Sequence, residues 1–212
     1  MVYVIGITGN IACGKTLVGQ MLLELGTERY IDADALVHRL YEKGQPIAEK
    51  IREIFGPETL APDGGVNRQK LGAIVFHDRS AMQQLERIVH PAVSEVVRQE
   101  LSTVSERGIA VLDAVKLLEG GSSALCQRKW LIICPEEQEM ARLMARNHLS
   151  RAEAQARIDA QPDTEKRRAL VDEVIDNGSS IQQTREQVIA ALTRFRQQVH
   201  QPIRIQEYNS HC

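Results

Sequence analysis

Aromatic residues are scarce in this chain: one Trp, three Phe and four Tyr make up 4% of its 212 residues. The core must therefore be built mainly from aliphatic side chains. A surplus of positive charge is missing too, since 26 Lys and Arg stand against 28 Asp and Glu. Proteins that bind nucleic acids over a broad surface carry a basic patch or stripe, so we predict no nucleic-acid partner.

Long apolar runs are also absent, and none approaches the roughly 18 residues that mark a membrane-spanning helix. The first residues lead into an apolar strand with no basic segment before it, so no signal peptide is predicted. Cysteine is rare, and no CxxC pair or zinc-ligand spacing is formed by Cys13, Cys126, Cys134 and Cys212. These absences predict a cytoplasmic protein with free thiols and no membrane partner.

The strongest motif is residues 9–16, which read GNIACGKT and fit the phosphate-loop pattern of Gly, four free positions, Gly, Lys and Thr. Residues 2–8 before it are β-branched and apolar, as in a buried parallel strand. Residues 16–25 after it carry an apolar stripe and are expected to form a helix. This strand–loop–helix context predicts a nucleoside triphosphate site. The alternative is a glycine-rich turn that binds nothing.

The chemistry of this loop follows from its residue types. Glycines let the backbone turn and approach a phosphate, and the amides at a helix N-terminus attract anions. Lys15 is expected to contact the β- and γ-phosphates of ATP, and the Thr16 hydroxyl is a candidate Mg²⁺ ligand. The loop and first helical turn predicted to bind the nucleotide comprise Gly9, Asn10, Ile11, Ala12, Cys13, Gly14, Lys15, Thr16 and Leu17.

Cys13 has two interpretations. Its place at a helix N-terminus would lower the pKa of the thiol and make it reactive. The interpretation that we favour is a small side chain that fills a free loop position.

Four further apolar segments are predicted to be strands: 30–31, 108–113, 129–134 and 171–176. Helices are expected at 35–55 with a break at Gly44 and Pro46, at 68–76 with Asn67 as cap, and at 79–106, 136–171 and 181–199. Pro91 should kink or restart the third of these, and the tail after Pro202 should be loosely held. Alternating strands and helices predict an α/β fold with a mostly parallel sheet and a helical insertion.

Three carboxylates follow predicted strands. Asp32 and Asp34 come at or just beyond the end of the second strand, and Asp113 ends the third. Ligands of open α/β sheets bind beyond the carboxyl ends of the strands, where the phosphate loop also opens. We predict that Asp32 and Asp113 lie near the metal and Asp34 further out towards an acceptor. The alternative for Asp34 is the N-cap of a helix that begins at Ala35.

Arginines are concentrated between residues 136 and 168. Arg142 and Arg146 are four residues apart and share a helix face, so we predict that they act on the phosphates. The other four are predicted to lie on solvated helix faces: Arg151, Arg157, Arg167 and Arg168. A GTPase would carry an Asn-Lys-x-Asp guanine reader, which this chain lacks. A structural ATPase stays open as an alternative, although the chain is small for one.

Several weaker motifs accompany the loop in a fixed order. They are Asp32-Ala33-Asp34, Arg68 with Leu71, Val75-Phe76, Leu85 with His90-Pro91, Val111-Leu112-Asp113, Leu117-Leu118-Glu119, Gln138 with Arg142 and Arg146, Arg157-Ile158 with Gln161, and Val174 to Asn177. With these motifs in this order, the chain resembles the dephospho-coenzyme A kinase family over nearly its whole length.

The resemblance implies ATP- and Mg²⁺-dependent phosphorylation of the ribose 3′-hydroxyl of dephospho-coenzyme A by a monomer or weak homo-oligomer. It implies a P-loop NTPase fold with three layers and three parts. The nucleotide core would span 1–34, 108–135 and 171–212, the helical coenzyme A region 35–107, and the helical lid 136–170. Asp34 would act on the acceptor hydroxyl, Arg146 on the phosphates, and Asn177 would lie near the adenine.

The chain departs from the family's usual pattern at Val115 and Lys116, where Pro and Leu are common. Lys116 either binds a phosphate of the acceptor or faces solvent. Two other functions stay open: a P-loop kinase for a nucleoside or shikimate-like alcohol, and a nucleotide-binding regulator with no acceptor.

Overall fold

The computed structural model describes residues 1–119 and 121–200. Within that range, five strands form one sheet in the order β2-β3-β1-β4-β5, and every neighbouring pair is parallel. The strands are β1 (Tyr3–Thr8), β2 (Arg29–Asp32), β3 (Ile109–Asp113), β4 (Arg128–Ile133) and β5 (Glu173–Asp176). The α/β fold and the parallel sheet predicted from the sequence are confirmed, and the strand limits agree within about two residues.

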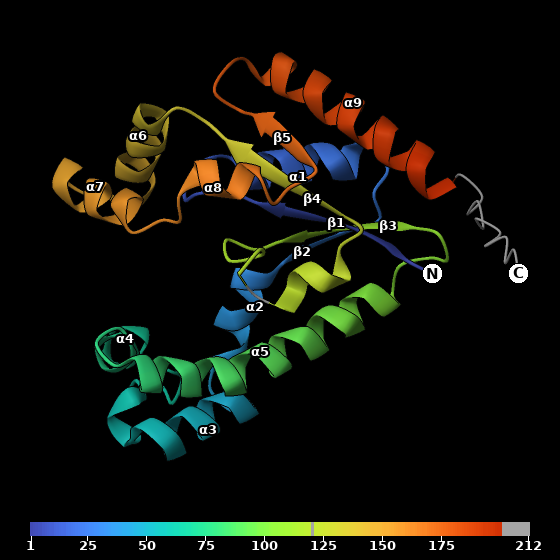
Figure 1. The fold of residues 1–212 in the computed structure, drawn as a ribbon. Coiled ribbons are helices and arrows are strands. Elements are labelled where there is room, and N and C mark those ends of the chain that lie inside the picture. Colours follow the sequence, from blue (N-terminus) through green and yellow to red (C-terminus); the bar gives the residue numbers. More distant parts are fainter. Residues whose placement is uncertain (120, 201–212) are drawn as a thin grey trace, which may run out of the picture.

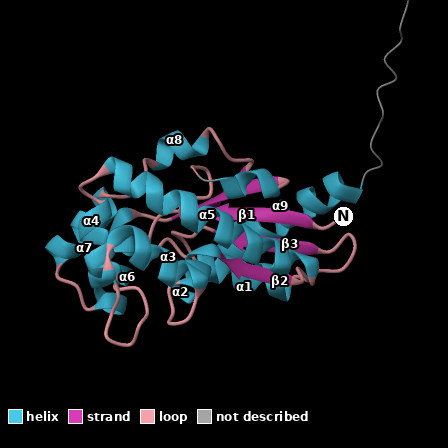
Figure 2. Ribbon diagram, turned by 90° about the horizontal axis from the view of Figure 1, so that it is seen from below, coloured by secondary structure: helices cyan, strands magenta, loops and turns pink. Residues whose placement is uncertain are grey.

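Helices cover both faces of the sheet (Figure 1). One face carries α1 (Lys15–Glu24) and α9 (Ile181–His200). The other carries α2 (Ala33–Leu40), α3 (Pro46–Phe55), α4 (Arg68–Val75) and α5 (Arg79–Ser102), with a 3-10 turn at Pro57–Thr59. Helices α3 and α4 pack on α2 and α5, and in Figure 2 α4 lies to the left of the strands. At the end of the sheet lie α6 (Glu136–Asn147), α7 (Arg151–Asp159) and α8 (Thr164–Arg168), and a second 3-10 turn spans Gly121–Leu125.

Strand side chains alternate between the two helical layers. Val4, Ile31 and Leu112 join a core with α2 to α5. Their neighbours Ile5 and Val111 join a second core with α1 and α9. Both sets are buried, as period-2 alternation in a sheet covered on both faces requires.

Helix α5 runs without interruption through Pro91, so the restart considered there does not occur. Val89 and Val93, on either side of the proline, are both buried in the core. Burial of a valine contributes about 1.5 to 3 kcal/mol, which offsets the roughly 3 kcal/mol that an internal proline costs. The expected cap is confirmed, because Asn67 Oδ1 accepts a hydrogen bond from the Lys70 amide at 3.1 Å.

The predicted helix over 136–171 consists of α6, α7 and α8. Pro162 lies in the segment that separates α7 from α8. A further break occurs at His148, whose φ of 53° ends α6 in the left-handed region. The tail after Pro202 and Cys212 lie outside the described residues. None of the helices described is long and apolar enough to cross a membrane.

Candidate functional site

The phosphate loop connects β1 to α1, and its glycines are required where they stand. Gly14 has a φ of 103°, and a Cβ there would lie 1.9 Å from Asn177 Nδ2. Gly14 is also the N-cap of α1 and provides no side-chain cap. The first amides of α1 therefore have no side-chain acceptor from the cap residue and can bind an anion.

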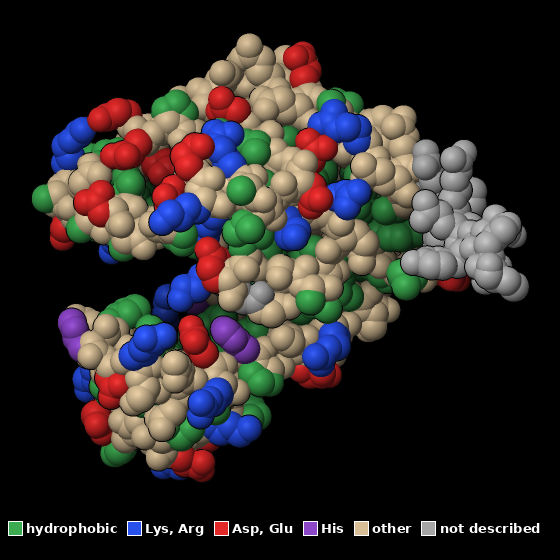
Figure 3. Space-filling model, in the orientation of Figure 1, with side chains coloured by type: hydrophobic (Ala, Val, Ile, Leu, Met, Phe, Trp, Pro, Cys, Tyr) green, Lys and Arg blue, Asp and Glu red, His purple; other side chains and the backbone are tan. Residues whose placement is uncertain are grey.

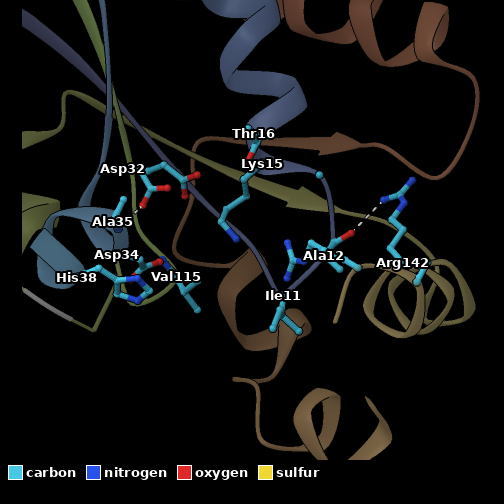
Figure 4. Close-up of a pocket in the computed structure, with 14 residues that line it drawn as sticks. Ile11, Ala12, Lys15, Thr16, Asp32, Asp34, Ala35, His38, Val115 and Arg142 are labelled. Carbon is cyan, nitrogen blue, oxygen red and sulfur yellow. Dashed lines mark hydrogen bonds between the residues drawn. The ribbon is translucent and has the colours of Figure 1, made fainter. Parts of the chain in front are cut away.

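The Lys15 side chain turns back over the loop. Its Nζ donates to the carbonyl oxygens of Gly9 at 3.0 Å and Asn10 at 3.3 Å. The side chain is half-buried. Carbonyl oxygens at the rim of the loop attract the ammonium group, and this holds the charge beside the anion site (Figure 4).

Asp32, and not Asp34, is the N-cap of α2. Helix α2 begins at Ala33, and Asp32 caps it by accepting from the Ala35 amide at 2.8 Å. Asp34 therefore lies in the first helical turn, and its interpretation as the cap was wrong. Its Oδ2 accepts instead from the Val115 amide at 3.2 Å, which joins α2 to the loop after β3.

Asp113 lies opposite Asp32 in the register of β3 and β2, and its side chain is buried. Its Oδ2 accepts from the Tyr30 hydroxyl at 2.5 Å, whereas Oδ1 has no hydrogen-bond partner among the described residues. Burial raises the pKa of Asp113 to about 6, against the opposing effect of the Lys15 charge. An unpartnered buried carboxylate oxygen is costly unless a cation compensates it.

The residues around Asp113 fit a magnesium ion that binds together with a nucleotide. Within residues 1–119 and 121–200, no three His, Cys, Asp or Glu side chains form a complete metal cage. Mg²⁺ needs no such cage, because substrate phosphates and water supply most of its ligands beside one or two protein groups. Asp113 Oδ1 and the exposed Thr16 hydroxyl are groups of this kind.

Two arginines of α6 approach the loop from the opposite side. Arg142 donates to the Ala12 carbonyl at 3.1 Å and to Gln138 Oε1 at 3.0 Å. Arg146 is exposed, and its Nε donates to Asn147 Oδ1 at 3.1 Å. Both arginines line the same cleft, so the shared helix face that their spacing predicts is confirmed.

Arg167 was wrongly predicted to face solvent. Only 2% of its surface is exposed, and it donates to the Val115 carbonyl at 2.6 Å and to Glu119 Oε1 at 3.1 Å. Helix α8 packs against the sheet, which turns this side chain inwards. The other three arginines are exposed as predicted: Arg151, which pairs with Glu137, Arg157, and Arg168, which pairs with Glu165.

We expect Arg167→Ala to lower the free energy of unfolding by roughly 2 to 3 kcal/mol, because it removes the hydrogen bonds to Glu119 and to the Val115 carbonyl and opens a space at α8. The Val115 carbonyl keeps one donor, the Thr8 hydroxyl at 3.0 Å. The neighbouring change Arg168→Ala removes an exposed ion pair and should cost less than about 0.5 kcal/mol. Urea unfolding of both variants measures the difference. Equal losses would mean that Arg167 contributes no more than a surface charge.

Asn177 braces the loop from β5. Its Nδ2 donates to the Cys13 carbonyl at 2.9 Å, and its Oδ1 accepts from Thr184 at 3.2 Å. Its position near the adenine stays a prediction. Cys13 is fully buried, and burial raises the pKa of its thiol to about 12. The reactive interpretation of Cys13 was therefore wrong, and the side chain fills space under the loop.

Glu139 of α6 is a buried carboxyl that sequence reasoning missed. Only 5% of its surface is exposed, and burial together with the nearby Glu136 charge raises its pKa to about 7. Lys15 and Arg142 oppose that rise. Its position in an acidic first turn gives no sign of burial, since Glu136 and Glu137 precede it.

We expect Glu139→Gln to stabilise the protein by roughly 2 to 3 kcal/mol more at pH 8 than at pH 4.5. The folded-state pKa lies above the unfolded one, so wild type loses stability as pH rises through about 7. Glutamine stays neutral throughout. Urea unfolding at both pH values measures this difference. The control is Glu137→Gln at an exposed position, for which the difference between the two pH values should be under about 0.5 kcal/mol. A pH-independent effect of Glu139→Gln would contradict it.

The phosphate loop, the three aspartates and the two α6 arginines line one cleft of about 1000 Å³. Figure 3 shows it as a hollow between the α6–α7 side and the α2–α5 side, with Lys and Arg side chains along its edges. Of the predicted site residues, those that line it are Ile11, Ala12, Gly14, Lys15, Thr16, Asp32, Asp34, Asp113, Arg142 and Arg146. Gly9, Asn10, Cys13, Leu17 and Asn177 are not among its lining residues.

The cleft is also lined by three residues that the sequence did not indicate, Ala35, His38 and Ala145, and by Val115, which stood out only as a departure from the family pattern. His38 stands four residues after Asp34, and this helical spacing is the signal that could have found it. An adjoining groove of about 490 Å³ shares Asp34, His38 and Val115 with the cleft. Its walls are largely apolar, and Lys116 and Arg68 provide positive charge. Lys116 is exposed at this groove.

The base of the predicted lid contacts the loop directly. The Ile11 amide donates to Gln161 Oε1 at 3.2 Å, and Asn10 Nδ2 donates to Thr164 Oγ1 at 3.3 Å. The segment that connects α7 to α8 is therefore held against the phosphate loop.

Solved structures resemble this fold over most of its length. A crystal structure of a Thermus thermophilus protein has a TM-score of 0.80 and 32% identity, covering 91% of this chain and 97% of that one. A dephospho-CoA kinase from Campylobacter jejuni has a TM-score of 0.54 and 25% identity over the same shares. A shikimate kinase from Acinetobacter baumannii, 14% identical with a TM-score of 0.54, shares the fold.

Sequence comparisons identify the family. The family model described as dephospho-CoA kinase matches residues 3–183. The dephospho-CoA kinase of Carboxydothermus hydrogenoformans is 41% identical over 195 residues, which cover 91% of this chain and 94% of that one. That of Bacillus cereus is 40% identical over 197 residues, with 92% and 98% covered. The chain therefore belongs to the dephospho-CoA kinase family.

Proposed function

We propose that this protein transfers the γ-phosphoryl group of ATP to the ribose 3′-hydroxyl of dephospho-coenzyme A. The observation that carries the proposal is one continuous cleft with a phosphate loop on one wall and the Asp34 carboxylate on the other. The family to which the chain belongs supports the choice of acceptor. The joining of cleft and groove at Asp34 supplies room for an acceptor larger than a simple alcohol.

On the donor side, the loop amides and Lys15 bind the phosphates of ATP. Lys15 exchanges its contacts with the Gly9 and Asn10 carbonyls for the β- and γ-phosphate oxygens. A magnesium ion held by Asp113 and Thr16, with Asp32 close to it, would neutralise charge on the phosphates. Arg142 and Arg146 add positive charge from the other wall of the cleft.

On the acceptor side, Asp34 orients the ribose hydroxyl and takes its proton. The exposed carboxylate stands where the cleft meets the groove, as a base between the two substrates must. The apolar walls of the groove suit the pantetheine arm, and Arg68 and Lys116 suit its phosphates. Water exclusion follows when both substrates fill the cleft.

The decisive test is an assay of the purified protein with ATP, Mg²⁺ and dephospho-coenzyme A. We expect stoichiometric ADP and coenzyme A, the latter identified by a mass gain of one phosphoryl group. Shikimate and adenosine, supplied separately, should release little ADP. Transfer to either of these alone would favour a different small-metabolite kinase, and binding of ATP with no transfer to any of the three would favour a regulator.

The two groups of arginines on the lid should differ in their effect on catalysis. We expect Arg146→Ala to lower kcat by at least about 100-fold with little change in ATP affinity, because a lid arginine acts on charge that develops in the transition state. Arg151→Ala, which removes an exposed ion pair with Glu137, is the matched control and should change kcat less than about twofold. Equal behaviour of the two variants would refute the choice of Arg146.

A further inference from the structure

Tyr30 connects two groups that the proposed function assigns to magnesium. It lies on β2, and its hydroxyl donates to Asp113 Oδ2 at 2.5 Å. The Thr16 hydroxyl lies near the same phenolic oxygen. The aromatic residue of an edge strand therefore reaches the end of β3 and the start of α1 at once.

Packing fixes the direction of this hydroxyl. The Tyr30 ring lies over Gly19 of α1, where a Cβ would stand 2.1 Å from Tyr30 Cε2. Gly19 is buried, so any larger side chain at that position would displace the ring. Because the ring is held between α1 and the sheet, its oxygen meets Asp113 without loss of side-chain freedom when a ligand binds.

The hydrogen-bond directions leave the right atoms for a metal. A phenol has one proton, and Tyr30 gives it to Asp113 Oδ2. Tyr30 therefore has no proton to donate to Thr16, and the Thr16 oxygen keeps its lone pairs. Asp113 Oδ1 is buried and has no partner among the described residues. One oxygen on each residue is thus available to a hard cation.

We propose that Tyr30 is a positioning residue for magnesium. Its hydroxyl holds Asp113 by Oδ2, and this directs Asp113 Oδ1 to the metal. The inference rests on the proposed function, because the metal is expected to arrive with ATP. Outer partners of metal ligands orient them and typically change metal affinity by about 10- to 100-fold. Tyr30 contacts the ligands and not the reacting atoms, so its effect should appear in metal binding before it appears in chemistry.

Tyr30→Phe tests the hydroxyl alone, since it keeps the ring over Gly19. Mn²⁺ serves as a spectroscopic probe in place of Mg²⁺, with a non-hydrolysable ATP analogue at pH 8. Electron paramagnetic resonance should show Mn²⁺ bound to the protein–analogue complex about 10-fold more weakly than in wild type. The affinity for the analogue without metal should stay within about twofold.

Tyr3→Phe is the matched control. The Tyr3 hydroxyl donates to the Val199 carbonyl at 3.1 Å, at the end of β1 opposite the phosphate loop. This variant loses a comparable hydrogen bond and should bind Mn²⁺ like wild type. If Tyr30→Phe also stays within about twofold of wild type, the inference is overturned.

A double-mutant cycle with Asp113→Asn identifies the route by which Tyr30 acts. If Tyr30 works through Asp113, Tyr30→Phe should weaken Mn²⁺ binding less than about twofold when Asp113→Asn is already present. A full second loss in the double variant would contradict the inference. Wild-type protein in which Mn²⁺ does not strengthen analogue binding would overturn the metal site as well, and absent transfer to dephospho-coenzyme A would overturn the proposed function separately.

Discussion

Lys15→Ala should lower kcat/KM for phosphoryl transfer by at least about 1000-fold, or about 4 kcal/mol. The ammonium group is the charge that the loop presents to the β- and γ-phosphates. Arg142 cannot replace it, because its guanidinium is held by the Ala12 carbonyl and by Gln138. Steady-state ADP release with ATP and dephospho-coenzyme A measures the loss.

The same substitution should leave the fold intact. It removes the hydrogen bonds from Nζ to the Gly9 and Asn10 carbonyls, which costs about 1 kcal/mol if water reaches these oxygens. Thermal unfolding without nucleotide separates this cost from the kinetic effect. Lys70→Ala, an exposed lysine on α4, is the control and should turn over like wild type. A folded Lys15→Ala variant with near-normal turnover would sink the phosphate-loop interpretation.

Local sequence pattern was sufficient for the features that depend on neighbours in the chain. The loop, the strand before it and the helix after it follow from residues 2–25 alone. Asp34 was expected near the site because it follows the second predicted strand, and Arg142 because it shares a helix face with Arg146; both line the cleft. The parallel register then brings Asp32 opposite Asp113, and both reach the cleft.

Features that depend on contacts between distant segments were not predictable in the same way. Arg167 and Arg168 are adjacent arginines in one short helix, and only the packing of α8 decides that the first is buried. Glu139 follows two exposed glutamates and becomes buried beside Cys13 and Lys15 because α6 packs against the phosphate loop. The cap moved from Asp34 to Asp32 because α2 begins two residues earlier than its apolar pattern indicates.

Asp34→Asn should lower kcat at least about 100-fold while the free energy of unfolding stays within about 1 kcal/mol of wild type. An alcohol is a poor nucleophile until its proton has an acceptor, and general-base help is worth roughly 10² to 10⁴ in rate. In the wild type the Val115 amide lies 3.2 Å from Asp34 Oδ2. Asparagine can still accept that hydrogen bond, but it cannot take a proton. Single-turnover transfer and urea unfolding on the same preparation measure both quantities.

Because Asp34 also accepts a hydrogen bond from the Val115 amide, Asp34→Asn distinguishes a structural role of the carboxylate from a role as the base. If Asp34 only fastens α2 to the loop after β3, the isosteric amide preserves that contact, and the variant should be both stable and active. If Asp34 is the base, the amide keeps the geometry and loses the chemistry, so stability and rate separate. Asp34→Ala removes both functions and should reduce stability as well as rate. An active Asp34→Asn protein would move the search for the base to Asp32 or Asp113, whose carboxylates line the same cleft.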